Sequence, residues 1–148
     1  MKLEPSSGTL NVIDSRIFNN RAGITATASP GLIKVNVYRS VITHNTSDGV
    51  FLNFGAQGTV NDSKLAFNGG AGVSLNNSAF NNATVLDSEV HHNAIGLFVG
   101  TGTTLRLGHS GINQNSTNFT NNGSIVTFCD NRSETNPFPG SVTNNCLK

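Results

Sequence analysis

Few side chains in this sequence could act in catalysis, and the best candidates stand directly before a recurring serine. At the five places where this serine occurs, the preceding residues are Asp14, Arg39, Asp62, Asp87 and His109. Two carboxyl groups held ~5–9.5 Å apart can cleave a glycosidic bond. Asp62 and Asp87 belong to neighbouring repeats and are therefore the candidate catalytic acids, and such a pair would also suit a cation. The alternative is that they are turn residues whose charge Arg39 balances.

The histidines are the candidates for a metal site. His44 and His92 stand at equivalent repeat positions, and Phe67 occupies that position in the repeat between them. If the repeats stack as β-strands, the two histidines lie ~9.6 Å apart, which is too far for one zinc ion whose ligands lie ~2 Å away. His91 and His92 are adjacent, and neighbours on a strand point to opposite faces. We therefore predict no metal site and no cofactor.

A binding surface is the third possibility. The strand expected after each repeat glycine has no carboxylate at its outward positions, but it carries Phe51 and Phe98 with Asn53 and Asn76 close by. Aromatic rings beside amides and hydroxyls can bind a sugar. They can equally dock a loop, a tail or another subunit, or pack under a turn. Lys64 and Glu89, which follow the serine in neighbouring repeats, are expected to form a surface ion pair between adjacent strands worth under ~1 kcal/mol.

These side chains are positioned by a repeat of 22–25 residues. Its markers are five serines that share a local context, namely Ser15, Ser40, Ser63, Ser88 and Ser110. Five residues after each serine comes an asparagine, which gives Asn20, Asn45, Asn68, Asn93 and Asn115. Aliphatic residues stand two positions after each serine and three positions before it. In the first four repeats a glycine follows the asparagine, and an apolar pair with one residue between its members comes next.

The period predicts an all-β fold, a single-stranded parallel β-helix of about five to six coils with three short strands per coil. Alternation of apolar residues within short segments rich in β-branched side chains is typical of strands, and no segment has room for a helix. Strands of successive repeats must then stack in register. Ser63 should lie over Ser88, and Asn68 over Asn93. Stacked side-chain amides can form a hydrogen-bonded ladder, with asparagine and glycine also serving the sharp corners.

Composition excludes several other classes of protein. Asn, Gly, Ser and Thr make up 68 of 148 residues, and charged residues are 11%. Coiled coils and helical bundles need far more Glu, Lys and Leu. The net charge of +1 without a basic cluster gives no indication of nucleic-acid binding, and no apolar run is long enough to span a membrane.

The pattern S-x-[ILV]-x-x-N-x-x-G-[IV] resembles the right-handed parallel β-helix repeats of pectate-lyase-like and NosD-like proteins. It is more closely similar to secreted bacterial β-helix repeat proteins of unassigned function, and the resemblance covers residues 10 to 131. The resemblance implies a right-handed coil and a secreted or cell-surface location. It specifies activity weakly, because such repeats serve enzymes, fibres and adhesive proteins alike. The sequence shows no signal peptide, so we expect a fragment or a truncated product.

We expect residues 1–9 to be a short lead-in that caps the first coil poorly, residues 10–128 to form the β-helix, and residues 129–148 to be an irregular cap. A Cys129–Cys146 disulfide would tie this cap down, and the alternative is two buried free thiols. An open first coil would allow end-to-end self-association.

Two functions follow as hypotheses. The first is a non-catalytic scaffold or binding module that binds glycan or another protein subunit through an outer sheet. The second is a polysaccharide-active enzyme of the pectate-lyase-like class (a lyase, hydrolase or epimerase), or a fragment of one, that uses Asp62 and Asp87.

Overall fold

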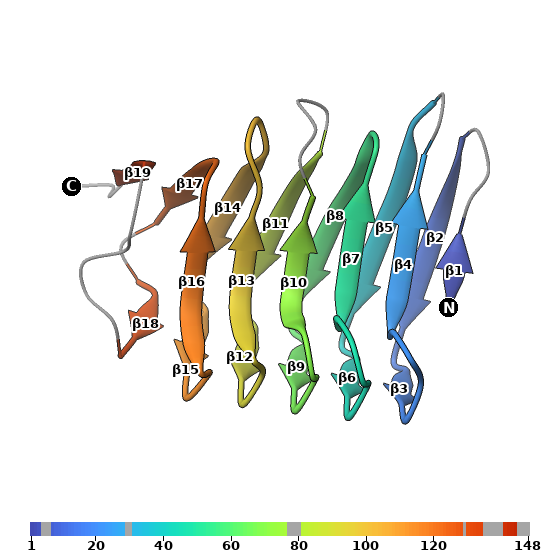
Figure 1. The fold of residues 1–148 in the computed structure, drawn as a ribbon, viewed down its shortest axis with the longest axis horizontal. Helices are drawn as coiled ribbons and strands as arrows, with labels where there is room; N and C mark the ends of the chain where they lie inside the picture. The colour runs from blue at the N-terminus through green and yellow to red at the C-terminus, as the bar shows by residue number, and fades with distance from the viewer. Residues whose placement is uncertain (4–6, 29–30, 77–80, 129, 135–140, 145–148) are drawn as a thin grey trace.

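The computed structural model describes residues 1–3, 7–28, 31–76, 81–128, 130–134 and 141–144. Within these residues the chain is all-β, and it winds into a right-handed parallel β-solenoid of about five turns (Figure 1). Each full coil contributes one strand to each of three parallel sheets. The predicted fold class is confirmed.

The three sheets, which we call A, B and C, run the length of the solenoid. Sheet A contains β1 (Lys2–Leu3), β4 (Ile24–Thr27), β7 (Val50–Asn53), β10 (Ala71–Leu75), β13 (Ile95–Val99) and β16 (Thr117–Asn121). Sheet B contains β2 (Gly8–Ile13), β5 (Ile33–Tyr38), β8 (Ala56–Asn61), β11 (Asn82–Leu86), β14 (Thr104–Gly108), β17 (Ser124–Thr127) and β19 (Ser141–Asn144). Sheet C contains the short strands β3 (Arg16–Phe18), β6 (Val41–Thr43), β9 (Lys64–Ala66), β12 (Glu89–His91), β15 (Gly111–Asn113) and β18 (Arg132–Ser133).

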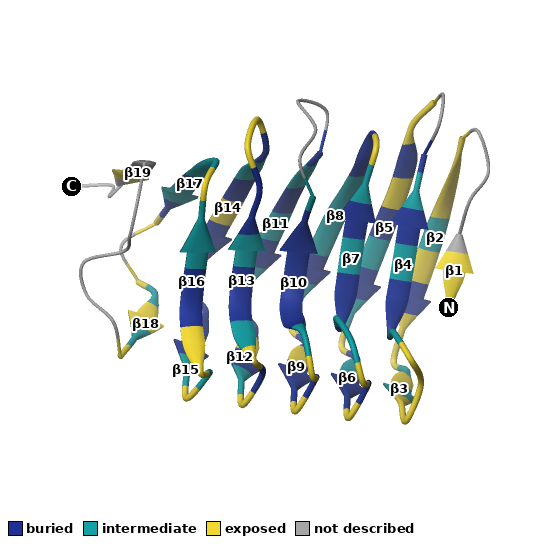
Figure 2. Cartoon of the chain, viewed as in Figure 1, coloured by how far each residue is buried: buried dark blue, intermediate teal, exposed yellow. Residues whose placement is uncertain are grey.

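The strands pair in the register that the repeat predicts. In sheet C, for example, Ile42 pairs with Leu65, which pairs with Val90. Their side chains point inward and are fully buried, and the dark blue segments of Figure 2 show buried residues along the central strands. Each buried aliphatic side chain of this kind stabilises the fold by about 1.5–3 kcal/mol. The core is therefore a set of aliphatic columns parallel to the solenoid axis.

A serine ladder connects the coils at the corner between sheets B and C. The backbone N–H of each of the first four repeat serines donates to Oγ of the serine in the next coil, at 3.0–3.2 Å. Each Oγ in turn donates to the carbonyl two residues before it. After Ser110 the acceptor is Oδ1 of Asn131. The corner therefore satisfies polar groups that would otherwise be buried without a partner.

An asparagine ladder stabilises the next corner. Nδ2 of Asn45, Asn68 and Asn93 donates to Oδ1 of the asparagine in the following coil at 2.9–3.0 Å. The same Oδ1 atoms accept the backbone N–H of the preceding asparagine. Asn20 differs because it is exposed, and its Nδ2 donates to the Phe18 carbonyl in its own coil. The expected ladder of asparagine side chains is present, and its buried part lies in the middle coils.

The ladder asparagines, which were expected to serve the sharp corners, do not themselves adopt the left-handed backbone there. It belongs to the residue before each ladder residue, such as Asp62 before Ser63 and Phe67 before Asn68. All ten residues in these two positions have φ between 45° and 56°, and they are Asp14, Arg39, Asp62, Asp87, His109, Asn19, His44, Phe67, His92 and Gln114. A non-glycine residue in this conformation costs roughly 1–2 kcal/mol. The hydrogen bonds of the ladder residue that follows each turn offset this cost and hold the turn in place.

The repeat glycines also act differently from the prediction. Gly49 and its equivalents do not adopt positive φ. A Cβ on Gly49 would lie 2.7 Å from the Gly72 carbonyl oxygen and 3.0 Å from Asn68 Nδ2. These glycines are needed because the next coil approaches the backbone closely.

The ends of the solenoid extend its sheets. β1 pairs with β4, although it lies in the segment expected to be a lead-in. β18 and β19 add to sheets C and B in the segment for which an irregular cap was predicted. Cys129 and Cys146 lie outside the described residues.

Candidate functional site

The outer face of sheet A carries an uncharged strip. Phe51 pairs with Ser74, which pairs with Phe98, so the two phenylalanines lie in one outward column on β7 and β13 with β10 between them. The column continues through Thr25 and Thr120. Both phenylalanines are half-buried, and Ser74 between them is only 6% exposed. Phe51, Ser74 and Phe98 therefore form a continuous surface, which we call the phenylalanine strip.

Amide groups border the phenylalanine strip. Asn76 Nδ2 donates to Asn53 Oδ1 at 3.1 Å, which joins the residues that follow Ser74 and Phe51 by two positions. Phe51 and Asn53 on β7, Phe98 on β13 and Asn76 directly after β10 thus lie on one face. The arrangement offers ring surface next to hydrogen-bonding groups without a formal charge.

A hollow of about 450 Å³ adjoins the N-terminal end of the strip, and Phe51 is part of its wall. Lys2, Arg21 and Asp48 also line it. Burial raises the pKa of Asp48, and a hydrogen bond from the Ala71 N–H at 2.7 Å opposes that shift. The N-terminal ammonium donates to the Gly23 carbonyl close by. Sequence reasoning missed this hollow because β1 forms one side of it, and the two-residue β1 has no repeat signature.

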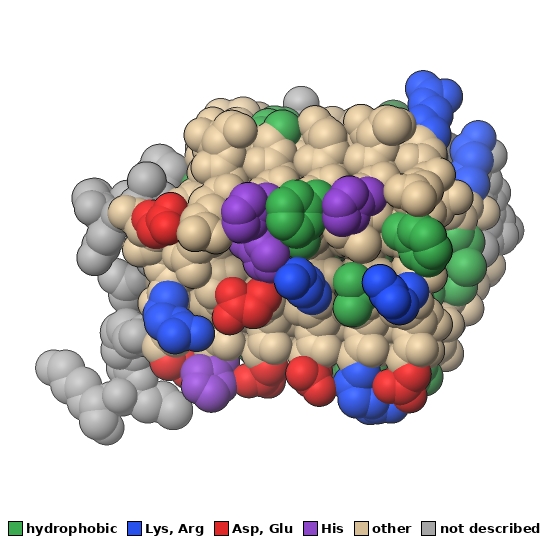
Figure 3. All heavy atoms as spheres, turned by 90° about the horizontal axis from the view of Figure 1, so that it is seen from below, with side chains coloured by type: hydrophobic (Ala, Val, Ile, Leu, Met, Phe, Trp, Pro, Cys, Tyr) green, Lys and Arg blue, Asp and Glu red, His purple; other side chains and the backbone are tan. Residues whose placement is uncertain are grey.

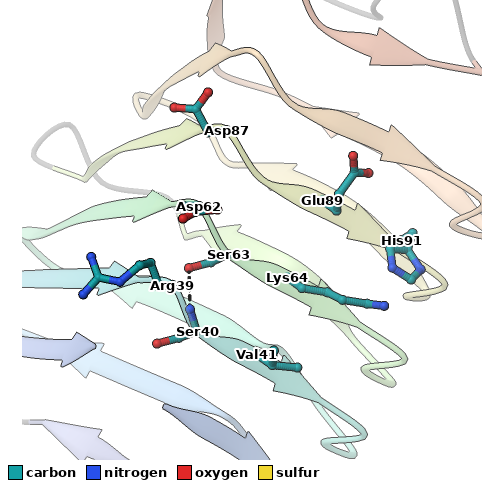
Figure 4. A pocket seen from close by; sticks show the side chains of 9 residues that line it. All are labelled: Arg39, Ser40, Val41, Asp62, Ser63, Lys64, Asp87, Glu89 and His91. Carbon is teal, nitrogen blue, oxygen red and sulfur yellow. Dashed lines mark hydrogen bonds between the residues drawn. The ribbon is translucent and has the colours of Figure 1, made fainter. Parts of the chain in front are cut away.

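The two candidate acids line a second hollow, which lies on the outer face of sheet C. It is an open depression of about 540 Å³. Its surface is formed by Arg39, Ser40, Val41, Asp62, Ser63, Lys64, Asp87, Glu89 and His91. Figure 4 shows both aspartates at the corner where the strands begin, with Lys64 and His91 farther along the strands and Arg39 pointing away from Lys64. The structure therefore brings Asp62 and Asp87 to one depression.

Most charges around this depression are engaged in exposed ion pairs. Arg39 makes two hydrogen bonds to the Asp14 carboxylate, at 2.8 and 2.9 Å. These bonds lower the pKa of Asp14 and raise that of Arg39. Asp87 Oδ1 lies 2.8 Å from His109 Nδ1. Exposed pairs of this kind contribute little to stability, because solvent screens them. Asp87 is thus held toward His109 at the corner, and the depression has no wall that would exclude water.

The predicted ion pair between Lys64 and Glu89 is wrong. The two residues are register partners, but Glu89 pairs with Arg132 at 3.5 Å. Gly111 lies between Glu89 and Arg132 in the register. Because glycine has no side chain, the Glu89 carboxylate can lie over Gly111 and reach Arg132.

A row of rings follows the asparagine corner. His44 and Phe67 stack with centroids 5.0 Å apart and an interplanar angle of 20°, and Phe67 and His92 stack at 4.7 Å and 21°. Figure 3 shows this alternation of histidine and hydrophobic side chains on the surface below the solenoid. The faces of Phe67 are covered by the histidines, so the row presents ring edges to solvent. It stabilises successive corners and offers no open ring face at its centre.

The expectation that His91 and His92 point to opposite faces is wrong. Their Nδ1 atoms lie 2.7 Å apart, and their rings meet edge to face at 4.9 Å. The reason is the left-handed φ of 54° at His92, which ends the alternation of the strand. Both rings therefore lie on the outside of one corner. The sequence signal that could have shown this is the column of residues before each ladder asparagine.

No known protein family, curated protein or solved structure matches this chain. In the part of the chain that the structure describes, no group of three or more His, Cys, Asp and Glu side chains is arranged to hold a metal ion. The same residues contain no helix that could cross a membrane.

Proposed function

We propose that this protein is a non-catalytic β-helix binding module that holds an extended, neutral polysaccharide against sheet A. The observation that carries the proposal is the phenylalanine strip, in which Phe51 and Phe98 stand two strands apart in one column with the uncharged Ser74 between them. That separation is ~9.6 Å, comparable to the length of a disaccharide. Sugar rings bind aromatic side chains through their apolar C–H faces, and amides bind their hydroxyls. The Asn53–Asn76 pair supplies such amides.

The absence of formal charge from the strip favours a neutral ligand. The outward column reads Thr25, Phe51, Ser74, Phe98 and Thr120 from β4 to β16, and Lys2 on β1 precedes Thr25 at its N-terminal end. A polymer of uronic acids would instead need cationic partners along its length. Two aromatic side chains at a spacing of two coils also suit a polymer whose sugar units repeat along its length.

The repeat pattern supports a place among pectate-lyase-like and NosD-like β-helix proteins, and a secreted or cell-surface location belongs to the same proposal. Another protein subunit is the alternative occupant of the strip. If a second copy binds there, light scattering will show a mass that rises with concentration and falls in the Phe51→Ala variant.

The test is isothermal titration calorimetry of the protein with soluble neutral glucans, mannans and xylans. Polygalacturonate is the charged comparison. We expect a neutral glycan to bind the natural chain and to lose affinity in the double variant Phe51→Ala/Phe98→Ala. Phe54→Ala is the matched control, because Phe54 is 56% exposed and lies outside the strip. Equal loss in the control, or binding of polygalacturonate alone, would refute the proposal.

A second candidate function is a polysaccharide-active enzyme, and the observation that favours it is the presence of Asp62 and Asp87 in one depression on sheet C. Release of reducing ends or unsaturated products from a glycan panel would support it, provided that Asp62→Asn and Asp87→Asn each abolish the release. The open shape of the depression and the contact of Asp87 with His109 favour the binding module over this enzyme.

A further inference from the structure

His91 and His92 place two imidazole nitrogens next to each other at the surface. Their Nδ1 atoms are 2.7 Å apart. Without a bound ion, this contact requires one Nδ1 to carry a proton and the other to accept it. When neither Nδ1 carries a proton, each has a lone pair, and their spacing of 2.7 Å would let one ion reach both nitrogens. That is the arrangement of a two-nitrogen chelate.

Both rings are fixed in place by neighbouring rings. His92 stacks on Phe67, with ring centroids 4.7 Å apart. His91 meets the edge of Phe67 at 5.8 Å, with an interplanar angle of 81°, and the edge of His92. The left-handed backbone at His92 sets the direction of its side chain. The pair is thus positioned before any ligand arrives, which reduces the entropy lost on binding.

The spacing of the nitrogens selects among metal ions. Imidazole nitrogens lie ~2.0–2.1 Å from a bound ion, so nitrogens 2.7 Å apart subtend roughly 80° at the ion. Square-planar and octahedral ions require about 90° between adjacent ligands, whereas tetrahedral zinc would need the nitrogens roughly 3.3 Å apart. Ni²⁺ and Cu²⁺ favour the first kind of geometry. We propose that His91 and His92 form a bidentate surface site for Ni²⁺ or Cu²⁺, with water in the remaining positions.

The charges around the pair are balanced. Burial lowers the pKa of His91, and Lys64 and His92 lower it further while Glu89 raises it. Glu89 is two residues before His91 on β12 and attracts a cation, while Lys64 on β9 repels one. The site therefore binds through its two nitrogens rather than through a surrounding negative charge.

The experiment is calorimetric titration of the whole chain with NiCl₂, repeated with ZnCl₂. We expect Ni²⁺ to bind more tightly than Zn²⁺, and we expect His91→Asn and His92→Asn each to weaken Ni²⁺ binding at least about tenfold, because each removes one arm of the chelate. Asparagine tolerates the left-handed backbone at position 92. Circular dichroism verifies that each variant is folded.

His44→Asn is the matched control. His44 occupies the same corner position and the same row of rings, but Thr43 precedes it, and the hydroxyl of Thr43 contacts His44 Nδ1 at 2.8 Å. This variant should bind Ni²⁺ like the natural chain. A second measurement on the natural chain, imidazole ¹⁵N nuclear magnetic resonance, should show Ni²⁺ broadening both Nδ1 signals of the pair first. Equal weakening in all three variants, or preference for Zn²⁺ over Ni²⁺, would overturn the proposal.

Discussion

Replacing Asn68 by alanine should remove much of the stability of the solenoid. Asn68 Oδ1 accepts both the backbone N–H and the Nδ2 of Asn45, at 3.2 and 2.9 Å. Its own Nδ2 donates to Asn93 Oδ1 and to the Ile42 carbonyl. Asn45, Asn68 and Asn93 are each 2% exposed, so water cannot replace these bonds.

The loss can be estimated from the groups left behind. In Asn68→Ala, two donors of Asn45 lose their acceptor, and a buried group without a partner costs about 1–3 kcal/mol. The expected decrease in the free energy of unfolding is therefore about 2–6 kcal/mol, a large part of the roughly 5–15 kcal/mol typical of a domain. The measurement is urea unfolding monitored by circular dichroism. The slope of the unfolding free energy against urea concentration should be the same in the natural chain and the variant.

Asn20→Ala is the matched control. Asn20 occupies the same repeat position in the first coil, but it is exposed, and its Nδ2 donates only within its own coil. We expect a loss under about 1 kcal/mol, because water can satisfy the exposed groups. If both variants lose the same stability, the buried ladder does not contribute as argued. Asn68→Asp separates the effect of hydrogen bonding from that of side-chain volume. It keeps the size and the acceptor oxygen but replaces the donor NH₂ by a charged oxygen. We expect this variant to be at least as unstable as the alanine variant at pH 7.

Three further perturbations test the corners and the N-terminal hollow. Gly49→Ala should lower the free energy of unfolding by about 1–3 kcal/mol or more, since its Cβ would meet backbone 2.7 Å away. Gly111→Ala should lower it less in the same urea assay, because its Cβ would meet only the flexible end of a glutamate side chain. Ser63→Ala removes the acceptor of a buried N–H and should lower the unfolding midpoint more than Ser15→Ala, and equal midpoints would argue against the serine ladder. Burial raises the pKa of Asp48 in the folded state, so its contribution to stability is complete below the ordinary aspartate pKa of about 3.9 and is lost as pH rises through the folded-state value. Asp48→Asn should therefore stabilise the protein at pH 7 and leave it unchanged at pH 3, and a gain of equal size at both pH values would contradict the role of the charge.

The candidate surfaces were partly accessible to sequence reasoning. The pairing of Phe51 and Phe98 with Ser74 between them follows from counting along the repeat, because both the spacing and the alternation of a strand are local properties. The hollow beside Phe51 could not be found in that way. It depends on β1, which pairs with β4 although its two residues carry no repeat marker.

The repeat alone predicts that each ladder residue stacks on its equivalent in the next coil. Parallel winding places each repeat directly on the next, so the columns of serine, asparagine and aliphatic residues become ladders and core without further information. Tertiary structure decided where the polar side chains at the corners point and which partner each one takes. Glu89 reaches Arg132 because Gly111 leaves the space between them open, and His91 meets His92 because a left-handed residue ends the strand. Both outcomes depend on side-chain directions and on the size of neighbours in other coils, which a period along the chain does not encode.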